Sequence, residues 1–340
     1  MFCGSYLRNN VDFYVAVDNS GLWPRLTLLP DGDIIASGYN YPGHATGNGN
    51  IDVWLSSDGG KFWKLQGTAT KHGNKPDFVR NNHAAGLNAK GEIIILTGGW
   101  TKGITVQETI QVSSSSDKGV TWKHYDTDIT GHPFGNIILT PQGKLACAIH
   151  HDDEKKSYIY WSRDNGVTWG DKQLLAENGT ETALLRCDNG VWLAAVRSRT
   201  VFGQGGYISC DNNITLIYKS ADEGENWTCK GPASLPNQAP ADLLEMRNGS
   251  ILLNHGSRVE GVFGVATRLS NDYGETWSDT EVLISVPHRV DCGYPSSVQL
   301  NDGTILTAYY FGPRQSDCSG GVPWHLRYHM GIAKYSLHEK

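Results

Sequence analysis

The octapeptide SSDGGKFW at residues 56–63 decides the fold, because four related copies follow it along the chain. These copies are SSDKGVTW (115–122), SRDNGVTW (162–169), SADEGENW (220–227) and SNDYGETW (270–277). All five share the pattern Ser-x-Asp-x-Gly-x-x-Trp, and successive copies begin 47 to 59 residues apart. A repeat of this period indicates an architecture built from one recurring supersecondary unit.

The residue types in the octapeptide are those of a tight turn between two antiparallel strands. In such a turn an aspartate accepts backbone N–H groups, a glycine adopts a positive φ, and the tryptophan returns to pack on the sheet. A short apolar strand precedes the copies, for example at residues 51–55 and 216–219. We therefore expect the five aspartates to be structural and not catalytic.

A second repeat alternates with the octapeptides. It consists of an apolar strand, a turn that contains glycine, and another apolar strand, which is the pattern of a β-hairpin. Its six turn glycines are Gly32, Gly91, Gly143, Gly190, Gly249 and Gly303. Each hairpin, together with the strand pair that an octapeptide closes, predicts one four-stranded antiparallel sheet.

These sheets predict an all-β fold, a six-bladed β-propeller with Asp-containing turns. The chain ends during the last blade, and the stretch 11–17 near the N-terminus is a spare strand. We expect this strand to complete the last blade and close the ring, which removes edges that would otherwise aggregate. No linker or charge block divides the chain, so residues 1–340 are predicted to form a single domain.

The composition excludes several classes of protein. Eleven tryptophans and an apolar content of 39% are too high for a disordered chain. No apolar run is long enough for a transmembrane helix, so we expect no membrane partner. The net charge of −6 argues against nucleic acid as a partner. No signal peptide is visible, whereas four Asn-x-Ser/Thr sequons favour a secreted or periplasmic protein, and the oligomeric state is not predicted.

The spacing of cysteines and histidines does not form a known metal motif. The seven cysteines include no Cys-x-x-Cys pair. The run His150-His151-Asp152-Asp153 could bind a cation, but adjacent residues of a strand point to opposite faces of a sheet. We therefore predict no metal site and no cofactor. Cys210 with Cys229, and Cys292 with Cys318, flank hairpins in pairs that could form disulfides.

Polar residues gather where the first strand of each predicted blade begins and the second strand ends. These two points share one rim beside the propeller axis, because the two strands are antiparallel. Counting from the turn glycines places the following polar side chains at or near this rim: Arg25, His83, His150, Glu181, Arg197, Asp242, Arg258, Tyr294 and Tyr310. Polar groups that converge from several blades predict a ligand pocket. The alternative is that these charges pair with one another and brace the blades.

The octapeptides resemble the Asp-box, or BNR, repeats of the sialidase superfamily, and the resemblance extends over essentially the whole chain. Residues 181–190, which lead to Ala195-Val-Arg197, are similar to the sialidase strand that begins with Glu and leads to an Asn-Ala-Arg-like segment. Tyr294 begins a segment that is similar to the last inner strand of sialidases, which starts with Tyr-Ser-x-Leu and runs to a glycine turn.

This resemblance implies a catalytic pair in which Tyr294 is the nucleophile and Glu181 takes its proton. Sialidases use a tyrosine where most glycosidases use a carboxylate. A neutral phenol can approach an anomeric carbon that bears a carboxylate, but its ordinary pKa near 10 means that it needs a base. The alternative is a tyrosine that packs and hydrogen-bonds to a bracing glutamate.

Two features depart from the sialidase pattern. Sialidases hold the substrate carboxylate with three arginines, but here Leu22 falls where the first arginine is expected and Arg25 lies three residues later. The other candidates for this clamp are Arg197, Arg199, Arg258, Arg289 and Arg314. The loop at 41–50 lacks the acid/base aspartate of sialidases, and we expect His44 to carry the proton there.

The sequence therefore predicts an exo-acting glycoside hydrolase that removes a terminal sugar, sialic acid or a related ulosonic acid, from an acidic glycan. The predicted catalytic residues are Tyr294, Glu181 and His44. The predicted substrate-binding residues are Arg25, His83, Arg197, Asp242, Arg258 and Tyr310. One alternative is a propeller that removes rhamnose next to glucuronate by hydrolysis or elimination. Another is a propeller that binds a carbohydrate without cleaving it.

Overall fold

The computed structural model describes the chain in nine segments. These are residues 6–8, 10–41, 43, 48–71, 78–101, 107–199, 213–286, 291–312 and 328–337. All the regular elements within these segments are β-strands, so the predicted all-β class is confirmed for them. This part of the chain contains no helix of the length and hydropathy needed to cross a membrane.

The first three sheets are antiparallel meanders that follow chain order. Their strands are β3 (Leu22–Leu28), β4 (Ile34–Tyr39), β5 (Ile51–Ser56) and β6 (Lys64–Thr68); β7 (Phe78–Leu87), β8 (Ile93–Thr101), β9 (Gln107–Ser115) and β10 (Lys123–Asp126); β11 (His132–Leu139), β12 (Leu145–His151), β13 (Lys156–Ser162) and β14 (Gly170–Glu177). The second and third meanders are also joined, because β7 and β11 pair in parallel.

Three further sheets continue the same pattern. Their strands are β15 (Gly179–Arg186), β16 (Trp192–Ser198), β17 (Ile214–Ser220) and β18 (Thr228–Pro232); β19 (Ala241–Glu245), β20 (Ile251–Ser257), β21 (Gly264–Ser270) and β22 (Glu281–Ser285); β23 (Gly293–Gln299), β24 (Ile305–Phe311) and β25 (His329–Tyr335). Two N-terminal strands add to them. β2 (Asp12–Val17) pairs antiparallel with β25, and β1 (Tyr6–Leu7) pairs parallel with β22.

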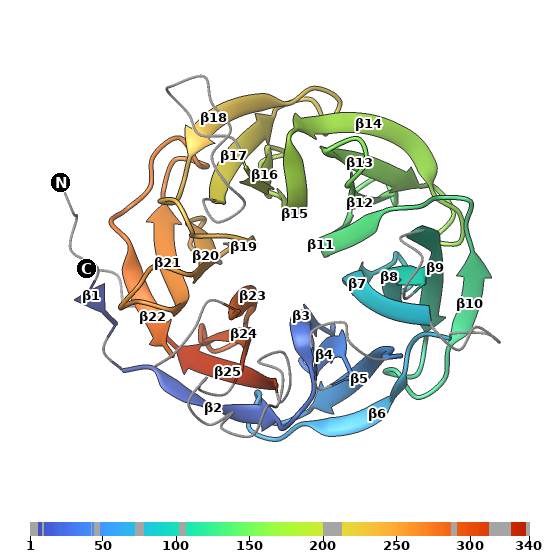
Figure 1. The fold of residues 1–340 in the computed structure, drawn as a ribbon, viewed down its shortest axis with the longest axis horizontal. Coiled ribbons are helices and arrows are strands. Elements are labelled where there is room, and N and C mark those ends of the chain that lie inside the picture. Colours follow the sequence, from blue (N-terminus) through green and yellow to red (C-terminus); the bar gives the residue numbers. More distant parts are fainter. Residues whose placement is uncertain are drawn as a thin grey trace.

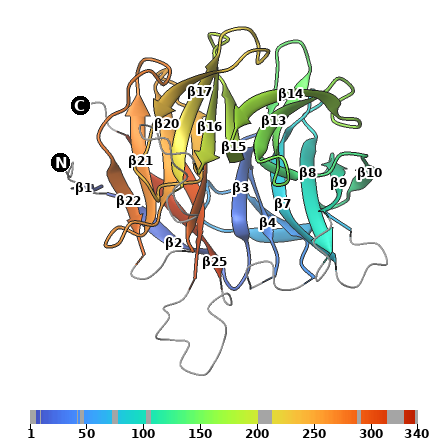
Figure 2. The ribbon, with the colours of Figure 1, turned by 45° about the horizontal axis from the view of Figure 1, so that its top comes forward.

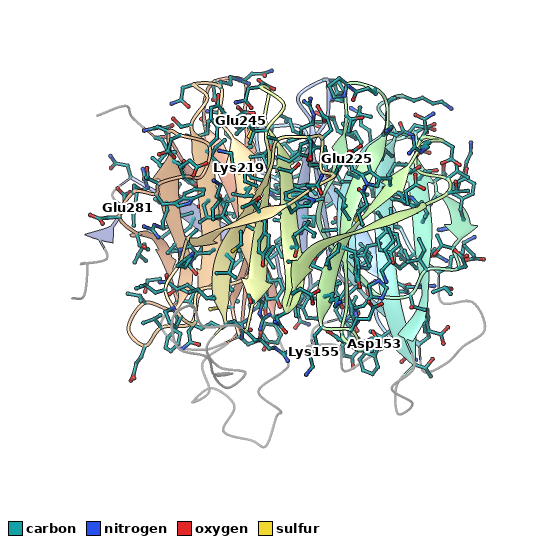
Figure 3. All side chains as sticks on the ribbon, turned by 90° about the horizontal axis from the view of Figure 1, so that it is seen from above. Asp153, Lys155, Lys219, Glu225, Glu245 and Glu281 are labelled. Carbon is teal, nitrogen blue, oxygen red and sulfur yellow. The ribbon has the colours of Figure 1, made fainter. Side chains whose placement is uncertain are left out.

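The sheets are arranged around a common centre, with one strand of each nearest to it. Figure 1 shows that these central strands are β3, β7, β11, β15, β19 and β23. The strands run between two opposite rims, as the tilted view in Figure 2 shows. Figure 3 places Asp153 and Lys155, which follow β12, at one rim, and Glu225, from an octapeptide, at the other. The octapeptide turns therefore lie at the rim opposite to the starts of the central strands.

The octapeptide turn is held by its own serine and aspartate. In the second copy, Ser115 Oγ donates to Asp117 Oδ1 at 2.8 Å, and the N–H groups of Gly119 and Thr121 donate to Ser115 Oγ and Asp117 Oδ1, each at 2.9 Å. Hydrogen bonds from Thr121 lower the pKa of Asp117 to about 2. The prediction that this aspartate accepts backbone N–H groups is confirmed, and the carboxylate is occupied within its own turn.

Each octapeptide tryptophan lies in a hydrophobic cluster that its sheet shares with the preceding sheet. Trp63 shares such a cluster with Leu306 of β24 and Met330 of β25, and Trp169 shares one with Ile94 of β8. The equivalent tryptophans elsewhere are Trp122, Trp227 and Trp277. The motif thus closes a hairpin and also packs one sheet against the next.

The two cysteine pairs that could form disulfides each have one member among the described residues. Cys229 and Cys292 carry free thiols, while their expected partners, Cys210 and Cys318, lie outside the described residues. Cys292 is buried and directs its Sγ toward the carbonyl oxygen of Ser257 at 3.7 Å.

The octapeptide glycine has two roles, because it adopts a positive φ and lets two sheets approach closely. Alanine substitutions can separate these roles. Gly119 has a φ of +89°, and a Cβ there would lie 2.8 Å from Cγ1 of Val53 in the preceding sheet. Gly143, in an inner hairpin turn, has a φ of +79°, but such a Cβ would meet no atom within 4 Å. We expect Gly143→Ala to lower the free energy of unfolding by about 1–2 kcal/mol through backbone strain alone. Gly119→Ala should cost about 1–3 kcal/mol more, because it adds a clash.

Urea unfolding of the parent chain and of both variants measures this difference, with the shift of the midpoint reporting lost stability. Equal losses in Gly119→Ala and Gly143→Ala would contradict the conclusion that the octapeptide packs the sheets together.

Candidate active site

Three side chains from three strands form one hydrogen-bonded group at the rim where the central strands begin. Tyr294 of β23 donates its hydroxyl to Glu181 Oε1 of β15 at 2.6 Å. Arg197 of β16 donates Nη1 to the same carboxylate oxygen at 2.9 Å and to Tyr294 Oη at 3.1 Å. The phenol oxygen therefore contacts both a base and a cation.

The protonation states of this group follow from its surroundings. Burial alone would raise the pKa of Glu181, but the positive charge of Arg197 and the hydrogen bond from Tyr294 hold it well below its usual range. Burial, and then the charge of Glu181, raise the pKa of Tyr294 well above that of a free phenol. Glu181 is therefore a carboxylate and Tyr294 a neutral phenol at neutral pH, which is the arrangement of a base and its proton donor.

Strand irregularities at the starts of the central strands direct side chains to this rim. The pairing of β3 with β4 shifts register between Leu22 and Arg25, and that of β23 with β24 shifts between Gly293 and Ser296. Within these shifts Trp23 and Tyr294 have φ values of 52° and 51°. Bulky residues adopt such φ values only at a cost in free energy, and strained residues of this kind cluster at functional sites.

A cavity of about 120 Å³ opens beside the three hydrogen-bonded residues. Its described lining consists of Trp23, Asn81, Asn82, His83, Phe134, Glu181 and Tyr294. His83 is buried, and its Nε2 lies 2.9 Å from Ser37 Oγ. Burial and the charge of Arg25 lower the pKa of His83 to about 3. This wall therefore offers amide groups, a neutral imidazole and aromatic faces to a ligand.

Arg25 and Asp242 form a buried ion pair and do not belong to the described lining of this cavity. Each side chain is 1% exposed, and Arg25 Nη1 lies 3.4 Å from Asp242 Oδ1. The guanidinium of Arg25 stacks 4.1 Å from the centre of the Phe134 ring, which is part of the cavity wall. Asp242 also accepts the N–H of Ser297 at 2.7 Å. This geometry matches the expectation that rim charges brace neighbouring sheets.

Arg258 and Tyr310 also lie near the ring of Tyr294. The guanidinium of Arg258 is 5.9 Å from the centre of the Tyr294 ring, and the Tyr310 ring is 5.4 Å from it. The hydroxyl groups of Tyr310 and Tyr328 both donate to Asp291. Burial by itself would lower the pKa of Arg258, but the nearby Tyr310, Tyr294 and Asp291 raise this pKa above the ordinary value. Arg258 thus stays charged beside the phenol.

Two buried guanidinium nitrogens at this site have no hydrogen-bond partner within the described part of the chain. They are Nε of Arg197 and Nε of Arg258. Buried N–H donors are normally satisfied, because leaving one unpaired costs about 1–3 kcal/mol or more for a charged group. Unpaired donors on two arginines near Tyr294 are suited to an anionic ligand.

The structure brings together most of the predicted residues that it describes. Glu181, Tyr294 and Arg197 are in direct contact, whereas Arg199 is exposed. His44, Arg289 and Arg314 lie outside the described residues. Leu22, at the place where the resemblance led us to expect the first arginine, is fully buried in the core.

Four residues near the site were not predicted, namely Asn81, His132, Asp291 and Tyr328. Asn81 stands two residues before His83 and Asp291 stands three residues before Tyr294, so counting further upstream from these predicted rim residues would have found both. His132 is opposite the predicted rim residue His150 in the β11–β12 ladder. Tyr328 follows a long connection after β24, and no turn glycine gives its position.

Comparisons with known proteins agree with this fold. The family described as BNR repeat-like domain matches residues 32–306. A sialidase of Paraclostridium sordellii is 24% identical over 290 residues, which cover 81% of this chain and 61% of that protein. The chain therefore spans about three-fifths of the length of this curated relative.

Solved structures show the same architecture at low identity. A protein of unknown function from Dyadobacter fermentans has a TM-score of 0.76 at 17% identity, covering 97% of this chain and 100% of that chain. Trypanosoma rangeli sialidase in complex with sialic acid has a TM-score of 0.69 at 14% identity, covering 97% of this chain and 60% of that chain. Together with the octapeptide repeats and the match over residues 32–306, this shows that the chain belongs to the BNR repeat-like domain family and is a β-propeller of the sialidase superfamily.

Proposed function

We propose that the chain is an exo-acting glycoside hydrolase that removes a terminal acidic sugar, sialic acid or a related ulosonic acid, from a glycan. The observation that carries this proposal is the hydrogen-bonded group of Tyr294, Glu181 and Arg197. A phenol that donates to a largely buried carboxylate, beside an arginine, is the nucleophile-and-base pair that a tyrosine-dependent glycosidase needs.

In the proposed first step, Tyr294 Oη attacks the anomeric carbon while its proton passes to Glu181. The bond from that carbon to the leaving oxygen breaks, and His44 protonates this oxygen. In the second step, water attacks the same carbon, His44 takes a proton from the water, and Tyr294 leaves with the proton held by Glu181. Two displacements at one carbon retain its configuration.

The proposed substrate carboxylate lies against Arg197 and Arg258. Both guanidinium groups are near Tyr294, and each has an Nε without a partner in the described structure. Arg25 and Asp242 brace the wall behind Phe134, so we assign them a positioning role. His83 lines the cavity wall, with its Nε2 hydrogen-bonded to Ser37 Oγ, and we assign Tyr310 a role in positioning Arg258 through Asp291.

We further propose that residues 1–340 form one six-bladed domain whose ring is closed by β2 in the last blade. Support comes from the sheet orders and from six hydrophobic clusters that join neighbouring sheets, including the cluster between the sheet of β3–β6 and that of β23–β25.

A second candidate is a hydrolase or lyase that acts on rhamnose linked to glucuronate. It is favoured by the small number of arginines near Tyr294. Leu22 is in the core and Arg25 is paired with Asp242, so two arginines of the described residues remain for a carboxylate clamp where sialidases use three. A panel of sialylated, KDN-capped and rhamnose–glucuronate glycans separates the candidates by their products, and an unsaturated uronate would indicate elimination. Binding of a glycan without any product would instead support a non-catalytic carbohydrate-binding propeller.

Tyr294→Phe and Glu181→Gln should each lower kcat by about 10²–10⁴-fold on the glycan that the parent chain cleaves. The first variant removes the nucleophilic oxygen, and the second removes the base. Tyr309→Phe is the matched control, because Tyr309 is a buried tyrosine of β24 that stacks on Phe311, away from this group.

Circular dichroism confirms that the variants are folded, and product release measures kcat. Parent-like turnover by Tyr294→Phe, or an equal loss in Tyr309→Phe, would exclude the proposed nucleophile.

The pH dependence of kcat/KM tests the role of His44. Glu181 stays ionised and Tyr294 stays protonated at neutral pH, so neither produces an inflection there. An ordinary histidine is protonated below about pH 6.5, so kcat/KM should fall as the pH rises through that value. In His44→Gln this alkaline decrease should disappear, with a loss of about 10²-fold in rate at lower pH.

A decrease that persists in His44→Gln with a midpoint near 6 would contradict this assignment. It would point instead to Asp242, whose pKa burial raises to about 6 against the opposing charge of Arg25.

A further inference from the structure

Three metal-ligating side chains lie together near the candidate active site. His132 begins β11, His150 is in β12, and Asp152 follows β12; His132 and His150 are opposite each other in the β11–β12 ladder. One ligand atom from each of the three lies within 4.8 Å of the others. Glu181 of the candidate active site lies near the start of β15, which is the central strand next to β11 (Figure 1).

The geometry points both imidazoles at one carboxylate. His132 Nε2 lies 3.2 Å from Asp152 Oδ2, and His150 Nε2 lies 3.7 Å from Asp152 Oδ1. The two rings are stacked, with their centres 4.9 Å apart and an angle of 29° between their planes. The stacking orients the two Nε2 atoms to the same side, as two ligands of one ion require.

His150 lacks the hydrogen bonds that a buried imidazole normally has. Its side chain is 6% exposed, and the 3.7 Å distance from Nε2 to Asp152 is too long for a hydrogen bond. Its Nδ1 is buried without a partner in the described segments. A buried polar side chain without partners is unfavourable, and a ligand at Nε2 would remove part of that cost.

We propose that His132, His150 and Asp152 bind a divalent transition-metal ion, for which Zn²⁺ is the best match. Two imidazole nitrogens and one carboxylate oxygen are a donor set that Zn²⁺ prefers, whereas Ca²⁺ and Mg²⁺ prefer oxygen ligands alone. Three protein ligands leave a coordination position open, which could accept an oxygen of a bound sugar. The side chain of Asp152 is 60% exposed, so an ion can enter from solvent.

The alternation of strand residues decides which members of the run His150–Asp153 belong to this cluster. His151 does point away from the cluster, and its Nε2 lies 3.0 Å from Tyr160 Oη. His150 and Asp152 are two residues apart, so they share a face, and the third ligand comes from the neighbouring strand. The sequence run His150–Asp153 alone could not reveal His132.

Zinc binding to the full chain, after treatment with a chelator, tests the proposal. Isothermal titration should give one Zn²⁺ per chain with a Kd of about 1–100 µM, since His150 Nδ1 has no partner to orient the ring. His150→Gln and Asp152→Asn should each weaken binding by at least about tenfold. Their matched controls, His151→Gln and Asp153→Asn, should bind as the parent chain does.

Two results would overturn the proposal: no saturable Zn²⁺ binding by the parent chain, or equal affinity in Asp152→Asn and Asp153→Asn. Asp152 is exposed, so its variant retains the test even if His150→Gln unfolds. Excess Ca²⁺ should not compete, and effective competition by Ca²⁺ would also contradict the assigned donor set. The readout is bound metal, not turnover, so it is independent of the proposed glycosidase activity.

Discussion

The structure depends on the packing of each sheet against its neighbours. Both faces of a sheet in such a ring must be buried, and the octapeptide provides this contact at one rim. Trp63 and its equivalents lie in the clusters between sheets, while Gly119 allows close approach to Val53. The serine and aspartate of the motif form the hydrogen bonds that hold the turn in one conformation. A surface loop can therefore also fix the spacing between two sheets.

This packing leaves the opposite rim available for polar residues. There the central strands begin with register shifts, which place Trp23 and Tyr294 at the cavity. Charges at the rim are buried, and burial requires partners. Arg25 and Asp242 satisfy each other, whereas Arg197 also holds Glu181 in its ionised form beside Tyr294. The bracing alternative raised by the sequence therefore describes Arg25 and Asp242, and the proposed function assigns the binding alternative to other residues of the same rim.

Periodicity predicted the parts of the fold that depend on local chemistry. Turn glycines such as Gly143 have the positive φ that a tight hairpin needs, and their spacing from Glu181 and Tyr294 predicted that these two residues meet. The direction of Arg25 could not be read from the sequence, because it depends on a register shift. Contacts made across a long connection, such as Asp291 with Tyr328, also have no local signal.

The central claim is that a tyrosine forms a covalent link to the sugar and is then displaced by water. The configuration of the first product reports this directly, because two displacements retain the anomeric configuration and one inverts it. Proton NMR of the sugar released during early turnover, before mutarotation, should show the same anomer as the substrate. Release of the opposite anomer first would contradict the account.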